Sequence, residues 1–255
     1  MIQAELVETN NQTMLGFHRQ TELTRELELL KPHRKKGQQD PQFTARSVAS
    51  VLVNKEDGEK ILFEKNIDEK LPIASISKLM TAYVSLEHYE SSSRTNELVH
   101  LSLIESNNWA AQDLAQIMGQ EKFVALMNST AQNLELNSTY FINPTGLDGK
   151  TEFNYSTARD LVKFTRQIIE HKPVIWRISL LQEYKNSLNT NQLLGQVSGI
   201  IGGKTGATIK AGECLLLVVQ APNDRGHIIN IILGSADRFG EMEELLDWVH
   251  NSYIW

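Results

Sequence analysis

Strand-like segments lie at the two ends of the main part of this chain, and a long helical stretch separates them. Residues 46–64 and 200–235 are rich in β-branched and aliphatic side chains with turn signals between them, which is typical of strands. Residues 75–190 carry apolar side chains at helical spacing. Because strands and helices do not alternate, this order predicts a central antiparallel sheet flanked by helices, an α/β fold of the α+β type, and not a doubly wound parallel sheet.

Local signals place the individual elements. SVASVLVN and ILFEKN predict two strands whose turn uses Asp57-Gly58 for the positive-φ position. ISKLMTAYVSL predicts a helix from about Ser75 to Glu87. Thr157 and Asp160 have the spacing of a capping box. Further helices are expected over residues 107–119, 121–134, 156–170 and 239–253, and further strands over residues 201–208, 212–221 and 227–235.

Residues 1–41 differ from the rest of the chain because they are polar and rich in charges. The part TELTRELELL predicts a short amphipathic helix, and the remainder has the composition of a linker. We therefore expect a polar N-terminal segment or linker over residues 1–41 and one folded domain over residues 42–255.

Composition argues against several classes of function. A formal net charge of -6 gives no general attraction to polyanions, so nucleic acid is not an expected partner. The single cysteine, Cys214, excludes an internal disulfide and lies in the apolar run CLLLVV, which is typical of a buried, inert thiol. The histidines form no metal-binding motif, so neither a metal nor a cofactor is expected.

The chain carries no sign of membrane insertion. No stretch approaches the roughly 20 consecutive apolar residues of a membrane span. The N-terminal residues MIQAELVETNNQ lack the apolar centre of a signal peptide. We therefore expect no membrane span in this chain, and an export signal or anchor, if one exists, to lie outside it.

The motif GGKTG at residues 202–206 allows two interpretations. In a phosphate-binding loop, glycine N–H groups and a Gly-Lys-Thr tripeptide would surround the phosphates of a nucleotide. That loop requires G-x-x-x-x-G-K-[ST] followed directly by a helix, whereas Ser198 occupies the first position and ATIKAGECLLLVV predicts a turn and a strand. The sequence favours the second interpretation, in which a strand holds a cationic Lys204 beside a serine nucleophile.

Ser75 and Lys78 form the pattern S-x-x-K at the start of the first expected helix. This spacing places both side chains on one helix face, with the serine near the positive end of the helix dipole. A lysine can act as the base for a serine when burial or a second cation lowers its pKa. Lys204 is the candidate for that second charge.

Three short motifs occur in a defined order, namely S-x-x-K at Ser75–Lys78, S-x-N at Ser106–Asn108 and K-T-G at Lys204–Gly206. Each is weak evidence alone, but the triplet in this order is typical of penicillin-binding proteins and class A β-lactamases. From Arg46 to Trp255 the chain resembles the low-molecular-mass penicillin-binding D-alanyl-D-alanine carboxypeptidases, in blocks such as KILFEKNIDEKLPIASISKLMTAYV, FINPTGLDGKTEFNYSTARDL and NTNQLLG. The resemblance implies a β-lactamase/transpeptidase-like fold with a helical subdomain beside the sheet.

The resemblance implies catalytic roles for Ser75, Lys78 and Ser106. Ser75 would attack the carbonyl of the penultimate D-alanine with neutral Lys78 as general base, and water would later release the shortened peptide from the acyl-enzyme. Ser106 would relay a proton to the leaving amine. The backbone N–H groups of Ser75 and Ala207 would form the oxyanion hole.

The resemblance also implies a set of substrate-binding residues: Asn108, Lys204, Thr205, Gly206, Ala207 and Arg238. Asn108 would hold the substrate amide, and Lys204 would keep the site cationic. Thr205 and Arg238 would receive the terminal carboxylate of the substrate. The NPTGL turn, Asn143–Leu147, is expected to be structural and near the cleft.

The function that the resemblance implies is a serine-type D-Ala-D-Ala carboxypeptidase. Its substrates would be peptidoglycan stem peptides ending in D-Ala-D-Ala, and β-lactam antibiotics would inhibit it by acylating Ser75. Because that substrate lies outside the cytoplasmic membrane, an extracytoplasmic location is implied, either in the periplasm or on the cell-wall face of the membrane.

Two features depart from the family pattern. Only residues 82–105 separate the first motif from the second, a shorter interval than is usual, and Asn107 stands where glycine is usual. We therefore expect a reduced or open cleft wall and an altered S-x-N loop. Two alternatives stay open, namely a D-alanyl endopeptidase acting on peptidoglycan cross-links and a non-catalytic wall-binding module of the same fold. A β-lactamase is disfavoured because no match to its deacylating Glu loop is visible.

Overall fold

The structure is a computed structural model that describes residues 31–54 and 58–255. The chain forms two compact units, one of Asp40–Val249 and one of Met1–Gln39 with His250–Trp255. The helix expected in TELTRELELL lies outside the described residues, and so does Asp57 of the expected turn. Gly58, the other residue of that turn, has φ +78° as predicted.

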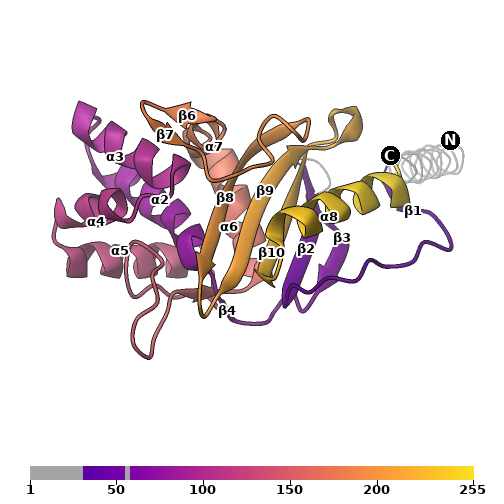
Figure 1. The fold of residues 1–255 in the computed structure, drawn as a ribbon, viewed down its shortest axis with the longest axis horizontal. Coiled ribbons are helices and arrows are strands. Elements are labelled where there is room, and N and C mark those ends of the chain that lie inside the picture. Colours follow the sequence, from indigo (N-terminus) through magenta and orange to yellow (C-terminus); the bar gives the residue numbers. More distant parts are fainter. Residues whose placement is uncertain (1–30, 55–57) are drawn as a thin grey trace, which may run out of the picture. The chain divides into compact units, whose positions relative to one another are not determined.

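The larger unit is built on a five-stranded sheet with the order β3-β2-β10-β9-β8, in which every neighbouring pair is antiparallel (Figure 1). The strands are β2 (Ser47–Asn54), β3 (Gly58–Lys65), β8 (Ile200–Thr208), β9 (Gly212–Gln220) and β10 (His227–Ser235). The N-terminal hairpin joins the C-terminal strands where β2 pairs with β10, with Ala49 opposite Ile231. The prediction of an antiparallel sheet from the two ends of the chain is confirmed.

Helices cover both faces of this sheet, with α8 (Arg238–Ser252) in front of it and α6 (Ala158–His171) behind it in Figure 1. The inner strands β9 and β10 are almost entirely buried, as residues sandwiched between two helical layers must be. The α8 residue Trp248 meets Phe63 of β3 edge to face at 5.4 Å, and α6 packs against β2 and β10. Cys214 of β9 is fully buried, and burial raises the pKa of its thiol to about 11, which fits the inert role expected of it.

The middle of the chain is helical, but less continuously than the sequence suggests. A 3-10 turn, η1 (Ala74–Ser77), leads into α2 (Lys78–His88), and α4 (Asn108–Gln116), α5 (Gln120–Asn133) and α6 match predicted helices. Two helices were not predicted, α3 (Ser93–Ile104) and α7 (Val174–Ser179). Two short antiparallel pairs also interrupt the helical region, β4 (Leu71–Pro72) with β5 (Tyr155–Ser156) and β6 (Glu183–Tyr184) with β7 (Ser187–Leu188).

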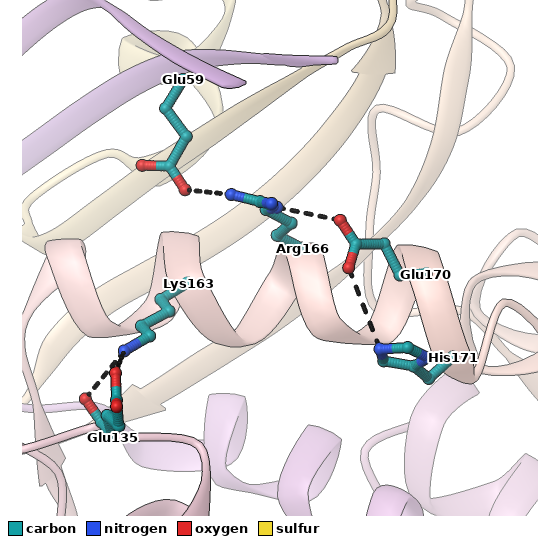
Figure 2. Close-up of polar contacts among 6 residues, drawn as sticks. All are labelled: Glu59, Glu135, Lys163, Arg166, Glu170 and His171. Atoms are coloured by element: carbon teal, nitrogen blue, oxygen red, sulfur yellow. Dashed lines mark hydrogen bonds and ion pairs between the residues drawn. The ribbon is translucent and has the colours of Figure 1, made fainter. Parts of the chain in front are cut away.

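Helix α6 is fixed at its start by a cap and along its exposed face by ion pairs. The Thr157 hydroxyl accepts a hydrogen bond from the Asp160 N–H at 3.0 Å, as the capping-box spacing predicts. Figure 2 shows Arg166 bridging Glu59 of β3 and Glu170, at 3.3 and 2.9 Å. Lys163 pairs with Glu135 at 2.7 Å, so these contacts connect α6 to the sheet and to the segment after α5 (Figure 2).

The smaller unit contains one short strand pair, β1 (His33–Arg34) with β11 (Tyr253–Ile254). The N–H of Lys35 donates to the carbonyl of Ser252 at 2.8 Å, which extends this pairing. The domain boundary at residues 41–42 stays a prediction. Within residues 31–54 and 58–255, no helix combines the length and the apolar character that crossing a membrane requires.

Candidate active site

Ser75 lies in the 3-10 turn η1, one turn earlier than the α-helix in which the sequence placed it. The preceding residue, Ala74, has φ +46°, a left-handed conformation that an L side chain adopts only under constraint. The constraint comes from both sides. A Cβ on Gly146 would lie 1.9 Å from the Ala74 carbonyl oxygen, and a Cβ on Gly206 would lie 2.9 Å from the Ser75 nitrogen. Only glycine fits at positions 146 and 206, and the turn that carries Ser75 packs between them.

Lys78 is fully buried at the start of α2, and its Nζ has three partners. It lies 2.8 Å from Ser75 Oγ, 2.8 Å from Asn108 Oδ1 and 2.6 Å from the Thr145 carbonyl oxygen. The amide and backbone oxygens can only accept hydrogen bonds, whereas a serine hydroxyl can also donate one. A neutral amine therefore gives its two hydrogens to Asn108 and Thr145 and accepts the Ser75 proton with its lone pair. Burial favours this neutral form because it lowers the pKa of Lys78 to about 7.

Lys204 reaches the same site from β8 and is also buried. Its Nζ donates to Ser106 Oγ at 2.8 Å and to the Thr205 carbonyl at 3.0 Å. Burial, and then the charges of Lys78 and Arg238, hold the pKa of Lys204 well below its usual range. The sequence left two possible causes of a lowered Lys78 pKa, burial and a second cation supplied by Lys204. Burial is the cause at Lys78, whereas the pKa of Lys204 is lowered in part by the charge of Lys78. Because the charge of Lys78 lowers the pKa of Lys204, the two buried amines disfavour being charged together.

Among the described residues, no carboxylate forms an ion pair with the basic side chains of the site, although Glu213 Oε2 accepts the backbone N–H of Arg238 at 3.1 Å. Within residues 31–54 and 58–255, the salt bridges do not include Lys78, Lys204 or Arg238. The same described part of the chain holds no cluster of three metal-ligating side chains. The arrangement is therefore suited to a ligand that brings its own negative charge.

The S-x-N loop makes its tight bend at Ser106, whose φ is +62°. Asn107 has φ -61° and ψ 121°, which any residue adopts, so glycine is not required there. The Asn107 side chain accepts the Ala110 N–H at 2.9 Å and caps α4. Asparagine at this position therefore stabilises the helix that begins at Asn108, and it does not distort the loop.

The strand residues after Lys204 meet partners from distant segments. Thr205 Oγ1 lies 2.5 Å from the Thr190 hydroxyl, and the Thr190 N–H donates to the Ile104 carbonyl. Arg238, at the start of α8, donates through Nη1 to the Gly206 carbonyl at 3.0 Å. The buried Nε of Arg238 has no partner within the described residues. The fold thus brings Arg238 against the K-T-G strand, next to Thr205.

Ala207 differs from the other predicted site residues because it is exposed, near the end of β8. It lies opposite Glu213 of β9 and is followed by the turn that joins the two strands.

The nine predicted site residues lie in or beside η1, α2, α4, β8 and the start of α8: Ser75, Lys78, Ser106, Asn108, Lys204, Thr205, Gly206, Ala207 and Arg238.

Three further residues contribute to the site without having been assigned to it from sequence. Thr145 supplies a carbonyl to Lys78, Gly146 packs against the Ser75 turn, and Thr190 contacts Thr205. The first two lie in the NPTGL turn, which was expected only to be structural. The block NTNQLLG, which contains Thr190, carried the family resemblance but gave no sign of which side chain faces the site.

Comparison with known families agrees with this geometry. The sequence model described as D-alanyl-D-alanine carboxypeptidase, Peptidase_S11, matches residues 34–97 and 87–237. The chain belongs to this family. The match consists of two segments that overlap at residues 87–97, inside the interval 82–105 that is short for the family.

Curated relatives carry two kinds of name. D-alanyl-D-alanine carboxypeptidase DacC of Escherichia coli is 31% identical over 82% of this chain and 62% of its own length. D-alanyl-D-alanine carboxypeptidase DacF of Bacillus subtilis is 26% identical over 85% of this chain and 65% of its own length. The D-alanyl-D-alanine endopeptidase of Pseudomonas aeruginosa is 29% identical over 80% of this chain and 78% of its own length. The chain therefore spans about two thirds of the length of these carboxypeptidases and more of the endopeptidase.

Solved structures confirm the β-lactamase/transpeptidase-like fold. Penicillin-binding protein D2 of Listeria monocytogenes, in its ampicillin-bound form, aligns with a TM-score of 0.75 and 27% identity, over 84% of this chain and 100% of that chain. The cefotaxime-bound form of the same protein aligns with a TM-score of 0.74. The family and fold that the three sequence motifs indicated are thus confirmed.

Proposed function

We propose that this chain is a serine-type D-alanyl-D-alanine carboxypeptidase that removes the terminal D-alanine of peptidoglycan stem peptides. The observation that carries the proposal is the environment of Lys78 Nζ, which lies 2.8 Å from Ser75 Oγ while its other two partners are carbonyl oxygens. An amine held in this way is a general base directed at a single hydroxyl. Membership of the family supports the same reaction.

In the first half of the proposed reaction, Ser75 Oγ attacks the carbonyl carbon of the penultimate D-alanine as its proton passes to Lys78 Nζ. The N–H groups of Ser75 and Ala207 stabilise the tetrahedral oxyanion. The C–N bond then breaks, and the leaving amine takes the proton that Lys78 received, relayed through Ser106, so that Lys78 is neutral again; Ser106 accepts a hydrogen bond from Lys204. The product of this half is an ester on Ser75 and free D-alanine.

In the second half, water attacks the ester with Lys78 again as base. The ester bond to Ser75 Oγ breaks, the serine recovers its proton, and the peptide leaves one residue shorter. The deacylating water and the attacking serine use the same base, because Lys78 faces the Ser75 oxygen directly.

The proposed carboxylate-binding residues are Thr205 and Arg238, with Lys204 behind them and Asn108 on the substrate amide. A bound carboxylate supplies the negative charge that the described side chains around the buried lysines do not. We expect its arrival to favour the ammonium form of Lys204, although burial and neighbouring cations disfavour that form in the free site. The cleft therefore selects peptides with a free C-terminus, as a carboxypeptidase does.

The same residues would serve a D-alanyl endopeptidase, and two observations support that alternative. The D-alanyl-D-alanine endopeptidase of P. aeruginosa is 29% identical to this chain. The connection from α2 to α3 is also short, running only from Tyr89 to Ser92. A cleft with less material at this point would leave room for a branched substrate.

Peptidoglycan as substrate and β-lactams as covalent inhibitors follow from the proposed reaction, and so does an extracytoplasmic location. The deciding experiment is intact-protein mass spectrometry after brief exposure to benzylpenicillin, with Ser75→Ala alongside. We expect a penicilloyl adduct on the parent protein and none on the variant. Absence of the adduct from both proteins, with the antibiotic intact, would instead favour the non-catalytic wall-binding module.

A second assay separates the two enzymatic alternatives. We expect the parent protein to release D-alanine from a peptide ending in D-Ala-D-Ala, and Ser75→Ala to release none. Conversion of cross-linked muropeptides to monomers without release of D-alanine would identify the endopeptidase.

A further inference from the structure

A single carboxylate joins the turn between β8 and β9 to the loop that follows Gly146. Asp148 Oδ1 accepts a hydrogen bond from the Thr208 hydroxyl at 3.0 Å, and Oδ2 accepts one from the Lys210 N–H at 3.1 Å. The Thr208 oxygen in turn accepts the Ala211 N–H at 3.1 Å. Asp148 therefore fixes two points of one tight turn directly, at Thr208 and Lys210, and the Thr208 hydroxyl extends the connection to Ala211.

The Lys210 side chain strengthens the same connection, because here a residue of the turn donates hydrogen bonds to the loop. Its Nζ donates to the Gly149 carbonyl at 3.1 Å and to the Lys150 carbonyl at 3.3 Å, and it lies 5.4 Å from the centre of the Phe153 ring. All of these partners belong to the loop that carries Asp148. The loop and the turn are thus connected twice, once through the Asp148 carboxylate and once through the Lys210 side chain.

The two N–H groups proposed for the oxyanion hole lie on either side of this connection. Ser75 packs against Gly146, two residues before Asp148. Ala207 directly precedes Thr208, whose hydroxyl Asp148 holds. We propose that Asp148 is a positioning residue that sets the position of the Ala207 N–H relative to the Ser75 N–H. This inference rests on the proposed function, and it adds a residue to which neither the sequence motifs nor the catalytic steps assign a role.

The position of Ala207 in the sheet explains why such a connection is needed. Among the described strands, β8 is the last of the sheet and pairs with β9 alone. Ala207 and Thr208 form the last two pairs with β9, opposite Glu213 and Gly212, so the ladder ends where the oxyanion donor lies. The end of an edge strand can shift more easily than its middle, and Asp148 restrains this end through Thr208 and Lys210.

Small displacements at this point have large consequences. An oxyanion hole acts because its donors are already placed where negative charge develops, and loss of one donor costs roughly 100-fold to 1,000-fold in rate. A misplacement of about 1 Å can cost on the order of 100-fold. We therefore expect substitution of Asp148 to slow acylation by roughly 10-fold to 100-fold.

The test compares Asp148→Asn with Asp160→Asn. Asp160 is a matched control, because its carboxylate also accepts one backbone N–H, from Ser138 at 2.7 Å, and one threonine hydroxyl, from Thr139 at 2.8 Å. It lies in the first turn of α6, and the hydrogen bonds of its carboxylate go to Ser138 and Thr139, which belong neither to the Ser75 turn nor to β8. Acylation rates are normalised to the number of active sites titrated by benzylpenicillin.

We expect Asp148→Asn to lower the acylation rate constant while the KM of the peptide changes less than about 3-fold. A boronic acid, which forms a tetrahedral anion on Ser75, should lose affinity by the same factor as the rate, since both depend on the oxyanion hole. The midpoint of the pH profile should stay at the parent value, because Lys78 is untouched. Asp160→Asn should leave the rate, KM and boronic acid affinity unchanged. Equal losses in both variants, or an unchanged affinity for the boronic acid, would overturn the proposal.

Amide hydrogen exchange separates this inference from the proposed function. We expect faster exchange over residues 207–211 in Asp148→Asn and not in Asp160→Asn, whether or not the parent hydrolyses peptides. Unchanged exchange there would refute the positioning role. If Asp148→Asn exchanges faster than the parent over these residues but the parent forms no adduct with benzylpenicillin, the proposed function alone is refuted.

Discussion

The pKa of Lys78 gives the sharpest prediction, namely the pH dependence of Ser75 acylation. A free lysine with pKa 10.5 is neutral in about one molecule in 3,000 at pH 7, whereas a pKa of about 7 makes about one in two neutral. At about 1.36 kcal/mol per pKa unit, burial disfavours the ammonium form by on the order of 5 kcal/mol. Because only the neutral amine accepts the Ser75 proton, we expect the acylation rate to rise about 10-fold from pH 6 to pH 8 and then to level off.

The assay is the second-order rate of acylation by benzylpenicillin, followed by mass spectrometry at a series of pH values from 6 to 9. Lys78→Arg should lose acylation at every pH, since a guanidinium stays charged throughout this range. His227→Gln is a control for a histidine whose pKa burial also perturbs, lowering it from its ordinary value, because His227 lies on β10 and not in the Ser75 turn. We expect the control to keep the parent profile. A rate that does not change between pH 6 and pH 8 would show that Lys78 is not the titrating base, and a midpoint near 10 would show that burial does not depress its pKa.

Further predictions concern the glycine packed against the Ser75 turn and the stability of the fold. Gly146→Ala should lower acylation more than 100-fold, because its Cβ would lie 1.9 Å from a backbone oxygen, whereas Gly119→Ala, with φ +91° and no atom within 4 Å, should cost only about 1 kcal/mol of stability and leave acylation unchanged. Between pH 7 and 10.5, Lys78 binds more protons in the unfolded state than in the folded state, so folding is stabilised as the pH rises. Over this range the free energy of unfolding of the parent, measured with urea, should increase by about 1.4 kcal/mol per pH unit relative to that of Lys78→Met. The same pH dependence of stability in both proteins would contradict this. Thr157→Ala removes the cap of α6 and should cost about 1 kcal/mol in the same measurement, and a loss below about 0.3 kcal/mol would argue against the cap. Arg166→Ala removes exposed ion pairs and should cost less than about 1 kcal/mol, with most of the loss disappearing at high salt.

Much of the fold could be predicted because its elements have strong local patterns. The five long strands are bounded by turn residues, and the helices at residues 108–116, 120–133 and 158–171 combine apolar periodicity with recognisable starts. Helix α3 was missed because SRTNELVHLSLI is polar in its first half, and its cap pairs Ser92 with Thr95 and not with the usual glutamate or glutamine. Helix α7 has only 6 residues, which is too short for a periodic signal.

The candidate site was partly predictable for the same reason. Motif spacing identified Ser75, Lys78 and Lys204, and the resemblance added Arg238. Thr145 acts through its carbonyl and Asp148 through a turn about 60 residues away in the chain, so the identity of their neighbours gave no signal. A backbone carbonyl is chemically the same at every residue, and only the fold decides which one meets an amine.

The sequence by itself determined which reactive groups this protein has and the order in which local elements present them. It could not determine their protonation or their exact partners. The lowered pKa of Lys78 arises from burial among α2, α4 and the loop containing Thr145, which come together only in the folded chain. The relative position of Ser75 and Ala207 likewise depends on contacts between η1, β8 and the loop after Gly146. Desolvation and precise placement are properties of packed neighbours distant in the chain, and for that reason tertiary structure alone decided them.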